Sequence, residues 1–278
     1  MINIKKSIAL LSLTFVINLI TLSPALADSL NLTTGTAEIS DETSVSLKNL
    51  SLDDKFYNAV IQLNLDGTYQ VLSATQVLIE NNATYQVEFE STWSSATHPD
   101  QFPSSSAHLS GLIGATHQSN FKLWENGMLA TPGIKSMAET GSKSPLNNEI
   151  DTAINNGNAE FLLSGDGINP SPGTALLTFD VTQKYAFVSL VSMIAPSPDW
   201  FIGVSGVSLI KKGQWIDELI IPLHAYDAGT DNGVTYLSPN NKTEPQGDIS
   251  RLEESPFTVN EENPTLGRFI FRRILLTL

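Results

Sequence analysis

The residues best suited to chemistry are three aspartates in two separate loops. Asp227 and Asp231 lie in the run Asp-Ala-Gly-Thr-Asp, and Asp199 lies in the run Pro-Ser-Pro-Asp-Trp. Glycine and proline surround all three, which favours loops over regular strands or helices. Carboxylates held on tight loops are ligands for a hard cation, and we expect calcium, which takes about six to eight oxygen ligands. Backbone carbonyls and water would complete such a site.

The spacing of the aspartates by itself leaves two interpretations open. It does not fit an EF-hand, which needs oxygen ligands at alternate positions followed by a glycine and a distant acid. Asp227 and Asp231 could be turn residues that accept hydrogen bonds from their own backbone. Alternatively, the turn that Gly229 permits could aim both carboxylates at one ion, and Asp199 would then approach from another loop at the same end of the fold.

The elements that must position these loops are short strands. Most of the chain consists of β-prone runs separated by turn residues, which predicts an all-β antiparallel sandwich with one or two short helices. The spacing of the runs alone does not separate a sandwich from a barrel. Residues 84–89 alternate, so Tyr85, Val87 and Phe89 are predicted to be buried on one face. Asp66-Gly67 between 57–65 and 68–72 predicts a hairpin. Further strands are predicted at 175–179, 186–194, 201–209, 216–223 and 267–276, and helices at 133–140 and 148–155.

The first 27 residues have the composition of a signal peptide. Lys5 and Lys6 precede an apolar stretch, and Ala25-Leu-Ala27 is typical of a cleavage site, so we expect a secreted chain, extracellular or periplasmic, that begins at Asp28. Residues 28–56 are then an N-terminal extension, 57–250 the sandwich domain, and 251–278 a C-terminal loop and closing strand. No later stretch is long and apolar enough to span a membrane.

The chain that remains after removal of the leader is strongly acidic. The sequence has 15 basic and 29 acidic side chains, and the leader removes two lysines and no acid, which leaves 13 against 29 and a formal charge of −16. This charge argues against nucleic acid as a partner, because phosphate binding needs a basic surface. It suits solubility and cation binding. Cysteine is absent, so no disulfide supports the core.

Several longer strings in the sequence resemble one known family, the spondin amino-terminal domain of the F-spondin and mindin type. The similar segments run in the same order, within 57–248, and are residues 93–99, 108–117, 130–141, 196–206, 215–218 and 226–240. The resemblance implies a β-sandwich related to C2 domains, a bound calcium ion, and adhesion to matrix or cell surface. It also implies that Asp199, Asp227 and Asp231 are the metal ligands. Animal members carry cysteines that this chain lacks near 209–215.

The resemblance therefore predicts a secreted calcium-binding adhesion module, not an enzyme, that binds an unidentified extracellular protein or glycan. One alternative is a metal-assisted hydrolase in which His98, His108 and His117 bind zinc. Their spacing is not that of a compact helical pair, so hydrogen bonding to loop backbone is the simpler interpretation. A second alternative is a purely structural envelope or matrix protein. Trp200 follows Asp199 on a loop, and we expect it to be exposed near the ion, where it could stack on a sugar or insert into a partner.

Overall fold

The computed structural model describes residues 36–39, 44–52, 55–63, 69–77 and 80–274. The chain divides into two compact units, one formed by 1–79 with 212–214 and the other by 80–211 with 215–278. In the first unit, four antiparallel strands pair in sequence order as β1 (Thr36–Ile39), β2 (Ser44–Leu52), β3 (Lys55–Leu63) and β4 (Tyr69–Val77). The three aspartates belong to the second unit.

The border between the units lies elsewhere than the sequence predicts. The predicted strands at 57–65 and 68–72 do pair with each other, as β3 and β4, but in the N-terminal sheet with β1 and β2. The Asp66-Gly67 turn lies outside the described residues. At the other end, residues beyond 250 supply β17 (Gly267–Ile274), which pairs with a strand on each side of it in the second unit. The unit that carries the aspartates therefore starts at Glu80 and includes the C-terminal strand.

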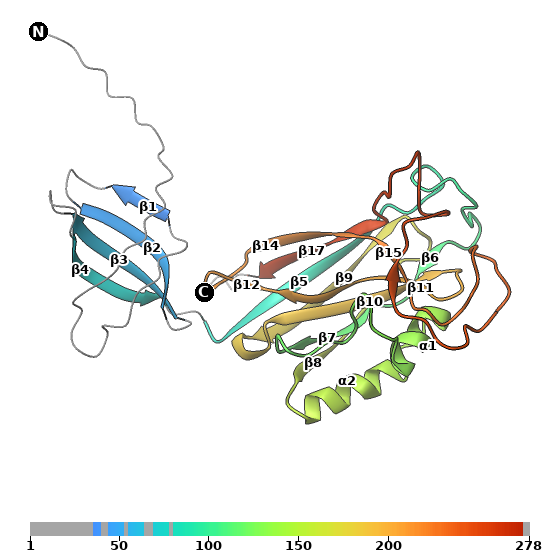
Figure 1. Ribbon diagram of the computed structural model, residues 1–278, viewed down its shortest axis with the longest axis horizontal. Coiled ribbons are helices and arrows are strands. Elements are labelled where there is room, and N and C mark those ends of the chain that lie inside the picture. The colour runs from blue at the N-terminus through green and yellow to red at the C-terminus, as the bar shows by residue number, and fades with distance from the viewer. Residues whose placement is uncertain (1–35, 40–43, 53–54, 64–68, 78–79, 275–278) are drawn as a thin grey trace, which may run out of the picture. The chain divides into compact units, whose positions relative to one another are not determined.

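Two antiparallel sheets form the second unit, which confirms the predicted β-sandwich (Figure 1). The larger sheet has the order β16-β15-β11-β10-β7-β8, with β6 also paired to β10, and the smaller has the order β14-β17-β5-β9. Two further strands, β12 (Ile210–Lys211) and β13 (Gln214–Trp215), pair with each other. The remaining bounds are β5 (Asn82–Ser91), β6 (His108–Leu109), β7 (Ile113–His117), β8 (Ala159–Ser164), β9 (Gly173–Thr182), β10 (Phe187–Ala195), β11 (Trp200–Ser208), β14 (Glu218–Leu223), β15 (Ala225–Asp227) and β16 (Ser250–Arg251).

The smaller sheet follows the predicted alternation. Tyr85, Val87 and Phe89 on β5 are fully buried, as expected from the sequence, and the residues between them are partly exposed. Phe89 packs edge-to-face against Phe269 of the neighbouring β17, with ring centroids 5.1 Å apart. The opposite face of this sheet carries ion pairs, such as Arg272 with Glu218 at 2.9 Å. Strict alternation therefore gives this sheet one buried and one solvated face.

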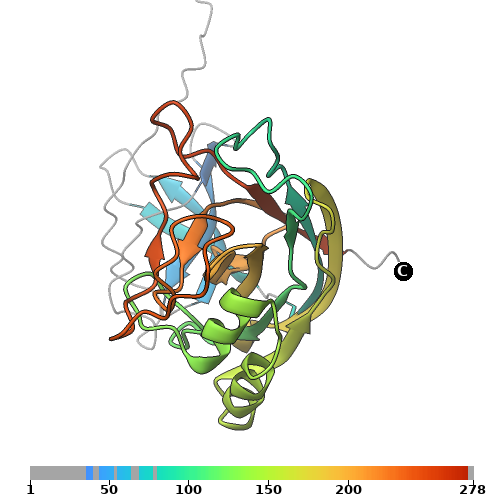
Figure 2. The same cartoon turned by 90° about the vertical axis from the view of Figure 1, so that its right-hand side faces the viewer.

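Two helices cover the outer face of the larger sheet: α1 (Pro132–Thr140) and α2 (Leu146–Asn155) (Figures 1 and 2). Both predicted helices are confirmed, with ends shifted by at most two residues. Their buried side chains share one apolar cluster with β10 and β11. Strand β10 is thus covered on both faces, which explains why its sequence is a nearly continuous apolar run with little alternation.

The start of α1 is held by a contact between the two helices. The Thr131 hydroxyl accepts a hydrogen bond from the Ile134 N–H at 3.2 Å and donates one to Glu149 Oε2 at 2.6 Å. Glu149 Oε1 accepts from the Gly133 N–H at 2.7 Å. A glutamate of α2 therefore helps to cap α1, where a negative charge is favoured by the helix dipole.

Replacing Thr131 with alanine should lower the free energy of unfolding by about 1 kcal/mol, because both the N-cap bond and the bond to Glu149 are lost. Urea denaturation followed by circular dichroism measures this change. Ser136→Ala is the control, because its hydroxyl lies on the same helix and bonds only Ser144 O and not the cap. An equal loss in both variants would contradict the capping role.

The long loops of the second unit gather at one end of the sandwich, near β6 and β15 (Figure 1), and Figure 2 looks onto this end. They are the segments 92–107, 196–199, 228–249 and 252–266. The last of them is anchored by Phe257, which is fully buried. In the part of the chain that the structure describes, no helix has the length and apolar character needed to cross a membrane.

Candidate metal centre

Strand pairing brings two of the three aspartates together. Strand β11 pairs with β15 so that Trp200 lies opposite Asp227 and Phe201 opposite Tyr226. Asp199 comes immediately before β11, and its carbonyl accepts a hydrogen bond from the Ala228 N–H at 3.1 Å. The turn before β11 and the loop after β15 are therefore held side by side by main-chain bonds.

The Asp199 carboxylate is fully buried and its two oxygens differ in environment. Oδ2 accepts three hydrogen bonds, from the Thr230 N–H at 2.7 Å, the Thr230 hydroxyl at 3.1 Å and the Asp231 N–H at 3.0 Å. Oδ1 has no hydrogen-bond partner among the described residues. Buried polar atoms are nearly always paired in folded proteins, so this oxygen needs an explanation.

Asp227 lies next to Asp199 and shares its unfavourable environment. Its Oδ1 accepts a hydrogen bond from the Gly229 N–H at 2.6 Å, which forms a tight turn. Burial raises the pKa of Asp199 to about 7, and the charge of Asp227 contributes to the rise. Burial also raises the pKa of Asp227. When a fully buried carboxylate lies beside a partly buried one, both are ionised only if a cation lies with them; otherwise one of them holds a proton.

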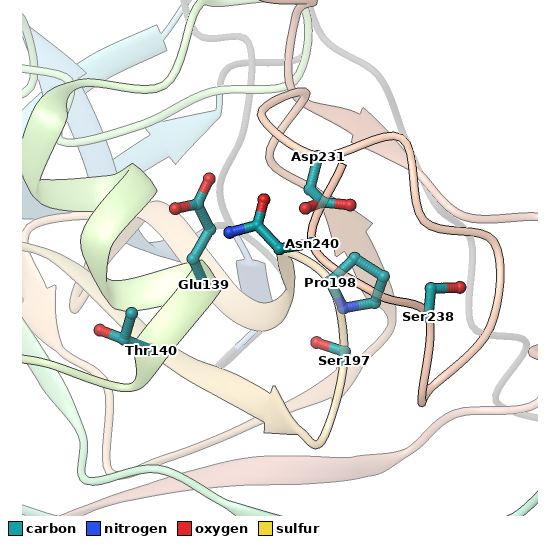
Figure 3. A pocket seen from close by; sticks show the side chains of 7 residues that line it. All are labelled: Glu139, Thr140, Ser197, Pro198, Asp231, Ser238 and Asn240. Atoms are coloured by element: carbon teal, nitrogen blue, oxygen red, sulfur yellow. The ribbon is translucent and has the colours of Figure 1, made fainter. Parts of the chain in front are cut away.

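Asp231 lies near this pair, but its carboxylate makes other contacts. Oδ1 accepts from the Gly233 N–H at 2.7 Å and Oδ2 from the Asn241 N–H at 2.8 Å. The side chain lines a polar cavity of about 170 Å³ that also touches Glu139 at the end of α1 (Figure 3). The negative charge of Asp231 still contributes to the raised pKa of Asp227.

The structure thus brings Asp199 and Asp227 into direct proximity and leaves the Asp231 carboxylate beside them. Within the described ranges, no three His, Asp or Glu side chains are gathered so that they could hold one ion as they stand. The donor set nevertheless fits a hard cation, because it offers only oxygens and includes the buried, unpartnered Asp199 Oδ1. Each Asp231 oxygen has a second lone pair, so it could join an ion without losing its backbone bonds. Whether all three aspartates are ligands stays a prediction.

The three histidines do not form the zinc site of the hydrolase hypothesis. His117 pairs with Phe187 at the start of β10 and His108 with Ala195 at its end, so their backbones are about 26 Å apart at roughly 3.3 Å per residue. Each ring also has its own local partner: His98 bonds Thr97, His108 bonds Ser106 O, and His117 bonds Gln118 O and Ser189. The histidine-based hydrolase is therefore wrong.

The expectation that Trp200 is exposed is also wrong. Its side chain is only 2% exposed. It packs edge-to-face against Phe257, with ring centroids 5.1 Å apart, and against Tyr236 at 5.4 Å. Trp200 is the first residue of β11, and its ring points into the aromatic cluster beneath the loops. It cannot stack on a sugar without unfolding this end of the sandwich.

Sequence reasoning missed the residues that hold the aspartates in place. Thr230 supplies two of the three hydrogen bonds to Asp199, and the Ser197 hydroxyl accepts from the Trp200 N–H at 3.1 Å, which shapes the turn around Asp199. The signal for Ser197 was present in the Ser-Pro-Asp run, since serine side chains often close such turns. The role of Thr230 has no comparable sequence signal, because it depends on the contact between distant loops.

The fold and the site define a β-sandwich with an acidic, oxygen-only site in the loops at one end. The family model named Spondin_N matches residues 83–264, and the chain belongs to this family. It is 33% identical over 178 residues to Spondin-2 of Rattus norvegicus, which covers 62% of this chain and 53% of that protein. It is 35% identical over 188 residues to Spondin-1 of Gallus gallus, covering 63% of this chain and 23% of that protein. The chain thus matches about half of Spondin-2 and under a quarter of Spondin-1, and the resemblance to the spondin family is confirmed.

Proposed function

We propose that this protein is a secreted, calcium-binding module of the spondin type that binds an extracellular protein or glycan in adhesion. The observation that carries the calcium proposal is the buried Asp199 carboxylate, whose Oδ1 has no partner among the described residues and whose neighbour is a second carboxylate, that of Asp227. A divalent cation bound between the two carboxylates would offset their repulsion and stabilise the pair.

In this proposal Asp199 and Asp227 hold the ion, together with Asp231. Calcium would supply the positive charge that offsets the repulsion between the carboxylates. Asp199 already joins two loops, because its Oδ2 binds the backbone of Thr230 and Asp231. An ion that binds the native fold but not the unfolded chain stabilises the fold. Extracellular calcium modules need an affinity of only about 10⁻⁴–10⁻³ M.

Three observations support secretion and binding as opposed to an intracellular role. The leader-like N-terminal segment, which lies outside the described residues, has the pattern of a signal peptide. The formal charge is strongly negative. The chain also belongs to the Spondin_N family. The chain covers only part of these relatives, so the identity of the extracellular partner is a matter for experiment.

Adding calcium to the chelator-treated protein should raise its melting temperature. Calcium at about ten times its dissociation constant adds roughly 1.4 kcal/mol, and for a domain of this size each kcal/mol corresponds to about 2–4 °C. The double variant Asp227→Asn/Asp231→Asn should lose this shift, while magnesium should give a smaller one because it resists dehydration. Differential scanning calorimetry measures the three melting-temperature shifts: wild type with calcium, double variant with calcium, and wild type with magnesium. A wild-type melting temperature that does not respond to calcium counts against the site.

The adhesion part of the proposal is tested by binding of the fluorescently labelled protein to cells and to a glycan array, with calcium and with chelator. We expect binding that falls in chelator while circular dichroism shows that the fold persists. Binding that is the same in both conditions would mean that the ion supports the fold alone. No binding to any surface would favour a structural envelope or matrix protein.

A further inference from the structure

We propose that Trp200 is a positioning residue of the ion site, because its indole N–H is the hydrogen-bond donor that directs the Asp227 carboxylate. The inference rests on the proposed function, since it assigns a role to a residue beside the calcium ligands. Trp200 itself does not contact the ion. It acts through Asp227.

The register of β11 and β15 places Trp200 beside Asp227. Trp200 on β11 lies directly opposite Asp227 on β15. Directly opposite residues of an antiparallel pair project from the same face of the sheet, with Cβ atoms about 4.5–5.5 Å apart. An indole ring at this distance can reach the carboxylate that faces it.

The indole nitrogen of Trp200 is buried and, within the described ranges, has no other partner. Trp200 is almost fully buried, and its Nε1 has no hydrogen-bond partner within normal geometry among the described residues. A buried indole N–H usually has an acceptor. Asp199 Oδ1, next to Trp200 in the sequence, is a second buried polar atom without a partner among the described residues.

The two aromatic rings packed on Trp200 do not account for its N–H. The rings packed on Trp200 belong to Tyr236 and Phe257. Phe257 has no acceptor atom, and the Tyr236 hydroxyl, itself without a partner in normal geometry, lies near the indole N–H of Trp93. The Asp227 carboxylate lies opposite Trp200 on the paired strand, and the proximity of the Trp200 N–H lowers the pKa of Asp227 against the effect of burial.

This arrangement matches the way in which ligands of metal ions are oriented. A ligating carboxylate is commonly held by a hydrogen bond from a residue behind it, and loss of that bond typically weakens metal binding about 10–100-fold. The Gly229 N–H holds one oxygen of Asp227 from the loop side. Trp200 would hold the carboxylate from the strand side, so that it faces Asp199 when the ion binds.

The test compares calcium dissociation constants of the full-length secreted chain and three variants by isothermal titration calorimetry. Trp200→Phe removes the N–H and should weaken calcium binding at least about tenfold. Trp215→Phe is the matched control, because Trp215 is equally buried but donates to Glu80 O at 2.9 Å, away from the aspartates. Tyr236→Phe keeps the ring on Trp200 and removes only the hydroxyl. Both controls should stay within about twofold of wild type.

A second substitution separates the hydrogen bond from the packing of the ring. Benzothienylalanine at position 200 keeps the shape of tryptophan but carries sulfur in place of the N–H. We expect the same weakening of calcium binding as in Trp200→Phe, with a melting temperature in chelator close to that of the wild type. Wild-type calcium affinity in the benzothienylalanine protein would overturn the inference and leave the calcium site intact. Absence of calcium binding in the wild type would overturn the proposed function itself.

Discussion

Replacing Asp199 with asparagine should stabilise the calcium-free protein at pH 8 and abolish its stabilisation by calcium. A carboxyl group with a pKa of about 7 in the native state and about 3.9 when unfolded destabilises the fold by up to about 4 kcal/mol above pH 7. Asparagine removes this charge, keeps an oxygen for the Thr230 and Asp231 donors, and offers an NH₂ group to Asp227. We expect a gain of about 1–3 kcal/mol in chelator.

The same group sets a pH dependence that asparagine should remove. Because the pKa of Asp199 is raised on folding, the native state keeps a proton that the unfolded chain has lost between about pH 4 and pH 7. The wild-type protein in chelator should therefore lose stability from this group as the pH rises through that window and level off above it. In calcium we expect the opposite pH dependence. The ion competes with the proton on Asp199, so the stabilisation by calcium grows as the pH rises.

Urea denaturation at pH 4, 5.5, 7 and 8, with and without calcium, measures both effects. The difference between wild type and Asp199→Asn cancels the titration of the acidic groups that do not interact with Asp199, and it reports the Asp199–Asp227 pair. The two stability curves should cross: the variant is more stable in chelator and the wild type gains in calcium. A variant that is less stable than the wild type under every condition would contradict the account, because Asp199 would then be a satisfied structural residue.

The second large effect is expected at Gly229, which links Asp227 to Thr230. Its φ of +72° is a conformation that favours glycine, and a Cβ atom there would lie 2.3 Å from the Gly247 carbonyl oxygen. The Gly247 N–H in turn donates to Gly229 O at 2.8 Å. Gly229→Ala should therefore lower the unfolding free energy by about 2–4 kcal/mol, because the strain of the conformation adds to the displacement of the facing backbone. Chemical denaturation measures it.

Gly157→Ala is a control matched in backbone conformation. Gly157 also has a φ of +72°, but a Cβ atom there would meet nothing within 4 Å. Its substitution should lower the unfolding free energy by only about 1 kcal/mol and leave calcium stabilisation unchanged, whereas Gly229→Ala should reduce it. Equal losses in the two variants would show that the contact with Gly247 has no special role.

Local patterns predicted the elements of the fold well. The alternation around Tyr85 identified the buried face of β5, and glycines at 141 and 157 marked where both helices end. The border between the two units was not predictable from such patterns. Strands β3 and β4 have ordinary β-prone sequences, and nothing in them indicates whether they pair with β1 and β2 or with the sandwich. Pairing partners depend on long-range contacts that periodicity does not encode.

At the candidate site, too, the loops were predictable from local sequence, whereas the contacts between distant segments were not. Glycine, proline and aspartate marked the loops, and the family resemblance singled out Asp199, Asp227 and Asp231. The burial of Trp200 could not be predicted, because it follows from the pairing of β11 with β15 and from the arrival of Phe257 on a distant polar loop. The contacts of the Asp231 carboxylate depend likewise on Asn241, across a loop.

Calcium titration into the chelator-treated protein, followed by isothermal titration calorimetry, tests the central claim most directly. We predict saturable binding of one calcium ion per chain with a dissociation constant of about 10⁻⁴–10⁻³ M, and no such binding in Asp199→Asn. Absence of saturable binding in the wild type, or an unchanged binding curve in Asp199→Asn, would contradict the claim that Asp199 and Asp227 hold a divalent cation.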